Sequence, residues 1–202
     1  MRYDTVAAFL TRLADRSPTP GGGATAALHA AQAAALVAMV GRYSDTPRYA
    51  EYADRIATIV RAADRLRVRS LRLAEDDITA FGAVGTAYRL PKDAPDRAAA
   101  VSAALLGAAR VPAEVIRVAD EILGLAEELE PIGNRNVITD VAAAADAARA
   151  AATTARVNVE VNLGGIADPA VVAELRAAVA GVDDLAARAD KVTAGVRDGL
   201  AR

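Results

Sequence analysis

The sequence predicts an all-α fold, a single-domain bundle of about seven helices, one of them very long. The chain has 202 residues, 53% hydrophobic and 25% charged, which suits one globular domain over residues 1–202 with a continuous core. Alanine, a strong helix former with a very small side chain, occurs 53 times against seven aromatic residues. Apolar residues recur at steps of three and four, and no alternating strand pattern competes with them.

The first half of the chain contains three expected helices. A short helix over residues 4–14 ends before the loop 17–23, which is rich in proline and glycine. An alanine-rich helix then runs to about Tyr43. Pro47 suits the first turn of a long helix that continues to about Tyr88, where two further prolines follow.

Prolines and glycines divide the second half of the chain into four more helices. We expect them over residues 96–110, from Pro112 to about residue 128, over residues 139–162, and from an Asp168-Pro169 cap to the C-terminus.

The alanine-rich helix is also the one stretch that resembles a membrane span, because no charged residue occurs between Pro20 and Gly41. It is mostly alanine and contains His29 and Gln32, so its transfer into lipid would gain little free energy. We therefore expect a helix buried in protein, with His29 as a hydrogen-bonded packing residue.

Composition excludes several classes of site and partner. The absence of cysteine removes disulfides and thiolate metal sites, and a single histidine argues against a multi-histidine metal centre or a Ser-His-Asp triad. Hydrolysis would therefore need carboxylates. The net charge is −2 without a basic stripe, which favours small molecules over nucleic acid or membrane as partners. Charges within the first ten residues argue against a signal peptide, so we expect a cytoplasmic protein.

Asp77 lies in an apolar row of the long helix, one turn from Leu73 and one turn from Phe81. Burial in such a row disfavours the ionised carboxylate and raises its pKa, which suits a general acid or base near neutrality. Asp76 falls in a different row, where Arg72 at i−4 can pair with it and keep it solvated. The alternative is that Asp77 pairs with an arginine from another helix.

A second polar row follows the helix over residues 139–162. It carries Asp140, Asn158 and Asn162 with small residues between them, so it could line a ligand cleft. Alternatively, this row is a close helix contact in which Asn158 and Asn162 bond to backbone carbonyls and Asp140 caps the helix start. The residues alone favour this second interpretation.

The glycine run Gly21, Gly22 and Gly23 enters a helix N-terminus, where free amides and the helix dipole attract anions. It is not a P-loop, because no lysine followed by serine or threonine stands at the required spacing, and no strand precedes it as a dinucleotide fingerprint needs. The alternative is a turn packed tightly against another helix.

Five motifs occur in the order seen in the cyclodeaminase/cyclohydrolase family. They are TPGGGATAALHAAQAAALVAMVG, DDITAFGAVGTAYRLPK ending at Lys92, Val111-Pro112, GNRNVITD over residues 133–140, and NVEVNL over residues 158–163. The chain thus resembles the cyclodeaminase half of formiminotransferase-cyclodeaminase and the stand-alone methenyltetrahydrofolate cyclohydrolases. The resemblance covers about residues 4–170 in motifs and the whole chain in length.

This resemblance implies an all-helical homodimer that binds a tetrahydrofolate derivative without a metal or other cofactor. The alanine-lined helix near residues 22–40 is the expected dimer contact. The aspartate of the family's D-x-x-A-F segment serves catalysis, and Asp77 occupies that position here. Family matches add the substrate-binding candidates Gly21, Gly22, Gly23, Lys92, Asn134, Asp140, Asn158 and Asn162. Ala24 departs from the serine that usually follows the glycine run.

Two reactions fit the resemblance. We expect hydrolysis of methenyltetrahydrofolate to 10-formyltetrahydrofolate, since no transferase domain accompanies this sequence to deliver a formimino group. The alternative is a formimidoyltetrahydrofolate cyclodeaminase that releases ammonia. A more remote alternative, suggested by Ala24, is a non-catalytic folate-binding or assembly protein.

Overall fold

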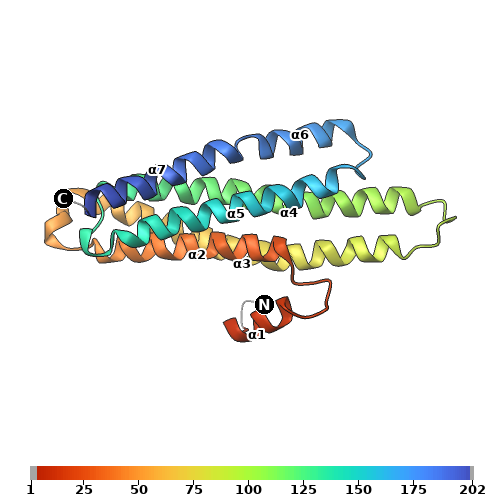
Figure 1. The fold of residues 1–202 in the computed structure, drawn as a ribbon, viewed down its shortest axis with the longest axis horizontal. Coiled ribbons are helices and arrows are strands. Elements are labelled where there is room, and N and C mark those ends of the chain that lie inside the picture. The colour runs from red at the N-terminus through yellow and green to blue at the C-terminus, as the bar shows by residue number, and fades with distance from the viewer. Residues whose placement is uncertain (1–3, 201–202) are drawn as a thin grey trace.

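A computed structural model describes residues 4–200 and shows long helices lying side by side in an elongated bundle, with the first helix set apart below it (Figure 1). The predicted all-α class is confirmed. The helices are α1 (Val6–Leu13), α2 (Gly22–Tyr43), α3 (Ala53–Tyr88), α4 (Arg97–Leu129), α5 (Thr139–Leu163), α6 (Pro169–Ala180) and α7 (Val182–Leu200), with 3₁₀ turns η1 (Pro47–Tyr52) and η2 (Arg135–Val137). Helices α2 to α5 form the core, and α7 packs on α5.

Helix α2 lies at the centre of this core. Most of its alanines, among them Ala27 and Ala34, are completely buried. A Cβ at Gly41 would lie 2.5 Å from Val60 Cγ2, so α2 and α3 approach each other more closely than a side chain would allow. By length and composition, α2 and α4 are each apolar enough to cross a membrane. Within the most apolar 18-residue stretch of each helix, 61% of α2 and 33% of α4 is buried inside the protein. The expectation that α2 is buried in protein is confirmed.

Two predicted helix boundaries were wrong. Pro112 was expected to start a new helix, yet it lies buried inside the continuous helix α4. The proline removes one backbone hydrogen bond, and packing of α4 against α3 and α5 on either side keeps its two halves in line. The last helix was expected to run unbroken, but it divides at Gly181 into α6 and α7.

The long helix begins later than expected. Pro47 starts the 3₁₀ turn η1, whose Tyr49 has a non-helical backbone, and α3 begins only at Ala53. Its 36 residues span about 54 Å at 1.5 Å per residue.

Helices α3 and α4 extend together beyond the start of α2 (Figure 1). Gly23 of α2 lies against Asp77, and α3 continues for about 16 Å to Tyr88. Leu73, before Asp77, is only 6% exposed, whereas Phe81 and Tyr88 beyond it are 46% and 52% exposed. The row that the sequence predicts to be apolar is therefore covered up to Asp77 and partly uncovered after it, because the first turn of α2 lies at Asp77 and no part of α2 extends beyond it.

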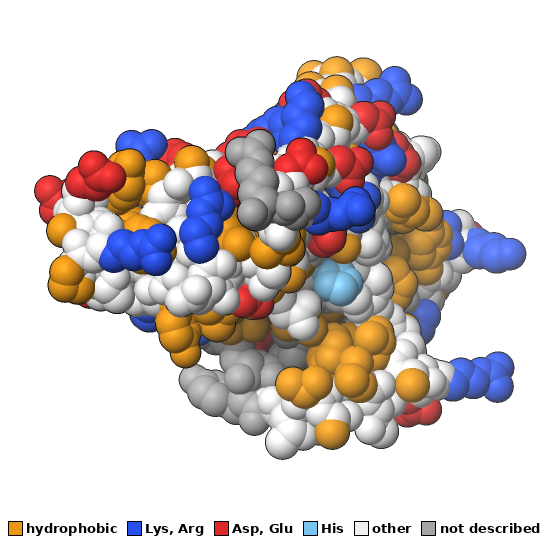
Figure 2. Space-filling view, turned by 60° about the vertical axis from the view of Figure 1, so that its left-hand side comes forward, with side chains coloured by type: hydrophobic (Ala, Val, Ile, Leu, Met, Phe, Trp, Pro, Cys, Tyr) orange, Lys and Arg blue, Asp and Glu red, His pale blue; other side chains and the backbone are white. Residues whose placement is uncertain are grey.

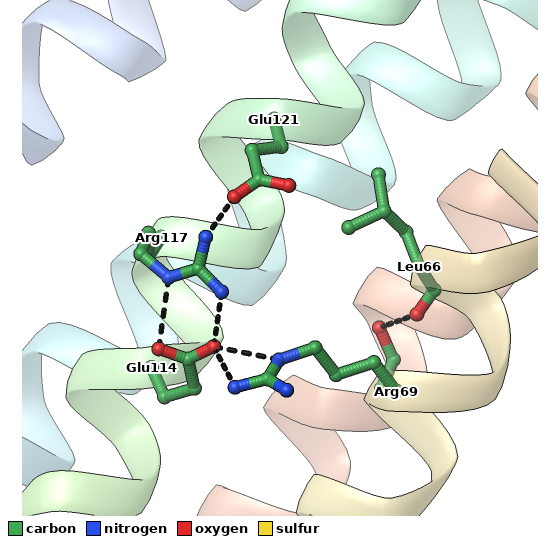
Figure 3. Close-up of polar contacts among 6 residues, drawn as sticks. Leu66, Arg69, Glu114, Arg117 and Glu121 are labelled. Atoms are coloured by element: carbon green, nitrogen blue, oxygen red, sulfur yellow. Dashed lines mark hydrogen bonds and ion pairs between the residues drawn. The ribbon is translucent and has the colours of Figure 1, made fainter. Parts of the chain in front are cut away.

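An ion-pair network links the outer faces of α3 and α4 (Figure 3). Glu114 accepts hydrogen bonds from Arg69 of α3 and from Arg117, and Arg117 also pairs with Glu121. These side chains are partly exposed, so the network contributes orientation more than stability.

The close approach at Gly41 gives a stability prediction. Gly41→Ala inserts a methyl group against Val60, and the overpacking cost of about 1–3 kcal/mol exceeds the helix-propensity gain. Chemical denaturation should show a net loss in the free energy of unfolding. Gly124→Ala in α4, where a Cβ meets no atom within 4 Å, is the matched control and should gain about 0.5–1 kcal/mol. Equal gains in both variants would contradict the close packing of α2 on α3.

Candidate functional site

The start of α2 lies directly against the carboxylate of Asp77. A Cβ built at Gly23 would be 2.0 Å from Asp77 Oδ1 and 2.5 Å from Cγ, so no residue with a side chain fits there while Asp77 keeps its place. The backbone amide of Ala24 donates a hydrogen bond to the carboxylate. The glycine run therefore lets the N-terminus of α2 contact the carboxylate of Asp77, where the sequence had suggested a site for an anion.

Burial raises the pKa of Asp77, and the hydrogen bond from the Ala24 amide opposes that rise only in part. The half-buried carboxyl thus has the environment that its apolar row predicts. Among residues 4–200, Asp77 forms no ion pair with an arginine, so the alternative interpretation was wrong. Asp76 is exposed as expected, but within the same described range it makes no ion pair with Arg72, and Arg69 of its row pairs with Glu114 instead.

Asn158 of α5 reaches the same helix start from the other side. Its Nδ2 lies 3.4 Å from the Cβ position of Gly22, one residue before the glycine that contacts Asp77. Nδ2 donates to the carbonyl of Thr154 at 2.9 Å, and Asn162 Nδ2 donates to the carbonyl of Asn158 at 2.7 Å. Both asparagines therefore bond to backbone carbonyls, as one interpretation held. The acceptors lie on α5 itself, however. Asn158 still lies against the start of α2, and Asn162 follows it one turn later on the same face of α5.

The structure does not bring Asn134 to this group. Helix α2 has 22 residues, about 33 Å, and Asn134 lies at its C-terminal end. There Asn134 Nδ2 donates to the Tyr43 carbonyl at 2.7 Å, and its backbone amide donates to Ser44 Oγ at 2.8 Å. The observed contacts of Asn134 fasten the turn before α5 to the end of α2.

Asp140 and Lys92 also lie away from Asp77. Asp140 is in the first turn of α5, about 27 Å along that helix from Asn158. Lys92 is exposed in the turn between α3 and α4, beyond Tyr88. Within one chain the candidate group therefore consists of Gly21 to Gly23, Asp77, Asn158 and Asn162.

Two residues differ from their expected roles. The side chain of Ala24 is completely buried, and its contribution to the site is the backbone amide, which sequence reasoning missed although the glycine run signals exposed amides. His29 was expected to be hydrogen-bonded, but within the described chain its ring has no hydrogen-bond partner. His29 lines a hollow of about 410 Å³ between α1 and the bundle, and the pale-blue histidine is visible there in Figure 2.

The raised pKa of Asp77 gives a pH-dependent stability prediction. When the pKa of a carboxyl is higher in the folded than in the unfolded state, its protonation stabilises the fold. This contribution to stability is complete below the unfolded-state pKa and is lost as pH rises through the folded-state pKa. Asp77→Asn should therefore raise the melting temperature near neutral pH, and the gain should vanish in acid below the ordinary aspartate pKa. Thermal denaturation across pH measures this, with Asp76→Asn as control. A gain that is unchanged in acid would contradict the burial argument.

The sequence is similar to those of known folate enzymes. Residues 5–181 match the family model described as formiminotransferase-cyclodeaminase. The chain is 38% identical over 176 residues to a methenyltetrahydrofolate cyclohydrolase of Methylorubrum extorquens, covering 85% of each chain. It is 34% identical over 175 residues to the formimidoyltransferase-cyclodeaminase of Sus scrofa, covering 83% of this chain and 32% of that protein.

A solved structure shows the same fold. The crystal structure of formiminotetrahydrofolate cyclodeaminase from Thermotoga maritima superposes with a TM-score of 0.86 at 29% identity, covering 100% of this chain and 99% of that one. The resemblance read from the five sequence motifs is therefore confirmed by an independent structural match. On the family match and these relatives, the chain belongs to the formiminotransferase-cyclodeaminase family.

Proposed function

We propose that this protein is a methenyltetrahydrofolate cyclohydrolase, which hydrolyses the methenyl bridge of its substrate to give 10-formyltetrahydrofolate. The observation that carries the proposal is a half-buried carboxyl of raised pKa, held against the N-terminus of α2 at the point where α3 continues beyond that helix. The relative named methenyltetrahydrofolate cyclohydrolase supports it, because that similarity covers 85% of both chains.

In the proposed reaction, water attacks the cationic carbon between N5 and N10 of the folate. Asp77, ionised, accepts a proton from that water, and a tetrahedral carbon forms. The bond from this carbon to N5 then breaks, Asp77 returns the proton to N5, and loss of the hydroxyl proton leaves the formyl group on N10. The negative charge of Asp77 also stabilises the cationic substrate before attack. The proposal needs no metal or other cofactor.

The groups around Asp77 have distinct proposed roles. The amide of Ala24 keeps the carboxylate ionised and oriented. Asn158 and Asn162 use Nδ2 for backbone carbonyls, so their carbonyl oxygens are the atoms available for the N–H groups of a pterin edge. Lys92, at the tip of the α3–α4 hairpin, is within reach only of the far end of an anionic glutamyl tail.

The second candidate is a formimidoyltetrahydrofolate cyclodeaminase, in which N10 attacks the formimino carbon and ammonia leaves. With the formimino group protonated, the same carboxyl would accept the N10 proton and deliver it to the former formimino nitrogen, whose bond to the carbon then breaks to release ammonia and leave the methenyl cation. The solved Thermotoga maritima structure carries that name and covers the whole chain, which favours keeping this candidate. The chain spans about a third of the length of the mammalian relatives, so their full activity is a matter for experiment.

Asp77→Asn tests the proposal directly. The variant keeps size and helix but cannot titrate, so turnover of methenyltetrahydrofolate should fall about 10²-fold or more, the usual scale for a positioned acid or base. The assay follows loss of the near-ultraviolet absorbance of methenyltetrahydrofolate above the non-enzymatic rate. Asp76→Asn, exposed and one residue away, is the control and should lose less than about tenfold. Equal losses would contradict the role of Asp77, and wild-type protein without activity on either folate substrate would favour a binding protein.

Gly23→Ala tests the contact between α2 and Asp77. Because its Cβ would lie 2.0 Å from Asp77 Oδ1, the carboxylate has to move, and turnover should fall about 10²-fold while the fold persists. Gly124→Ala in α4, away from the site and with no atom within 4 Å of the added Cβ, is the control and should keep wild-type turnover. Unchanged activity in Gly23→Ala would show that the position of Asp77 against α2 does not matter to the reaction.

We also propose that the protein forms a homodimer. Most alanines of α2 are buried inside the chain itself, so the surface left for a partner is a stripe along α2. This stripe contains no charged residue and is formed by Thr25, Leu28, His29, Gln32, Ala35, Leu36 and Met39. Beside it, α1 stands away from the bundle (Figure 1), with Val6 76% and Leu10 54% exposed, and together with α2 and α3 it lines an apolar hollow. A second copy would bury both surfaces.

Sedimentation in dilute buffer checks this assembly. The expected mass is twice the 20.7 kDa chain, and Leu28→Glu, which places a charge in the uncharged stripe, should shift the protein towards monomer. Val68→Glu on the outer face of α3 is the control and should leave the dimer intact. A fully active wild-type monomer would refute the proposal.

A further inference from the structure

Two of the chain's seven aromatic residues lie on α3 just beyond Asp77. Phe81 follows Asp77 by four residues and shares its face, which places the two side chains about 6 Å apart. Tyr88 continues the same row at the end of the helix. Phe81 is 46% and Tyr88 52% exposed, while Val84 between them is 8% exposed.

The exposure of Phe81 and Tyr88 begins where α2 stops covering α3. Leu66, Ser70 and Leu73 occupy the same row before Asp77 and are buried under α2. Phe81 and Tyr88 face the same side of α3, but α2 begins at Gly22 and does not reach them. The result is an aromatic surface that continues directly from the carboxyl of the candidate site.

A cation stands at the far end of this surface. The guanidinium of Arg97, at the start of α4, lies 5.9 Å from the centroid of the Tyr88 ring, and its Nε donates to the Leu90 carbonyl at 3.2 Å. These contacts fix the guanidinium beside the ring with further N–H donors free for an anion. Asp93 and Asp96 lie in the same turn, so an anion would be held by direct contact with Arg97 rather than by net charge.

We propose that this face of α3 is the subsite for the aryl arm of the substrate, with Phe81 stacking on the p-aminobenzoyl ring and Arg97 binding the glutamyl carboxylate. The inference rests on the proposed function, since it assumes a folate whose reacting carbon lies at Asp77. The p-aminobenzoyl ring is attached to N10, which is bonded to that carbon, so the ring must lie within about one helical turn of Asp77. Phe81 is the aromatic residue at that distance. The order of Asp77 and Phe81 on α3 and Arg97 at the start of α4 matches the order of reacting carbon, aryl ring and carboxylate along the substrate.

The test uses p-aminobenzoylglutamate, which contains the arm without the reacting carbon. Its binding to the full-length protein is measured by calorimetry, and its competition against methenyltetrahydrofolate is measured kinetically. Phe81→Ala and Arg97→Ala should each weaken binding of this fragment about tenfold, the scale of a lost stacking or charge-assisted contact. Phe81→Ala should raise KM by a similar factor and leave kcat within about threefold, because an arm remote from the reacting carbon contributes uniform binding.

Two matched controls test whether removing any exposed apolar or aromatic side chain weakens binding of the fragment. Val68→Ala removes an exposed apolar side chain from the opposite face of α3, and Tyr43→Ala removes an exposed aromatic ring at the far end of α2. Both should bind the fragment as wild type does. Phe81→Leu keeps apolar volume without the ring and should bind more weakly than wild type.

The outcomes distinguish this inference from the proposed function. Wild-type binding of the fragment by Phe81→Ala would overturn the subsite even if Asp77→Asn abolishes turnover. A shift of Phe81→Ala from dimer to monomer would also overturn it, since the face would then be an interface between copies. If wild-type protein hydrolyses no folate but loses fragment affinity in Phe81→Ala and Arg97→Ala, the subsite holds and the proposed reaction fails.

Discussion

The contact between the first turn of α2 and the carboxyl of Asp77 is the constraint on which the site depends. With a Cβ position only 2.0 Å from Asp77 Oδ1, residue 23 has to be glycine if the carboxyl is to remain in place. The same contact decides where α2 stops covering α3. It therefore buries Asp77 enough to raise its pKa, supplies the Ala24 amide that orients it, and leaves Phe81 beyond it uncovered.

The rest of the bundle makes this contact rigid. Alanine-rich faces let α2 pack closely on α3, α4 and α5, so the position of its N-terminus is fixed by a long, well-packed core rather than by a loop. Ionised Asp77 destabilises that core at neutral pH, as is common where a carboxyl is held for chemistry. The exposed ion pairs between α3 and α4 lie outside the core and align the two helices whose extension continues the site.

Periodicity and alanine content were enough to predict the fold class, and the row around Asp77 predicted its raised pKa, because both depend on spacing within one helix. The exposure of Phe81 was not predictable in this way, since it depends on where α2 begins relative to α3. Local signals misplaced two helix boundaries in opposite directions. The break expected at Pro112 is absent, because packing on neighbouring helices carries α4 through the proline, whereas the helix expected to be continuous divides at Gly181. Asn134 shares a family motif, yet the tertiary fold places it at the C-terminal end of α2, about 33 Å along that helix from the glycine run at its start.

The central claim is that α2 and the core hold Asp77 as a carboxyl of raised pKa. Carbon-13 NMR of aspartate-labelled protein, titrated through the acid range, measures this directly, and the spectrum of Asp77→Asn assigns the resonance. The account predicts one carboxyl signal, missing in that variant, whose pKa lies above the ordinary aspartate value. A signal for Asp77 that titrates at or below the ordinary value would contradict it.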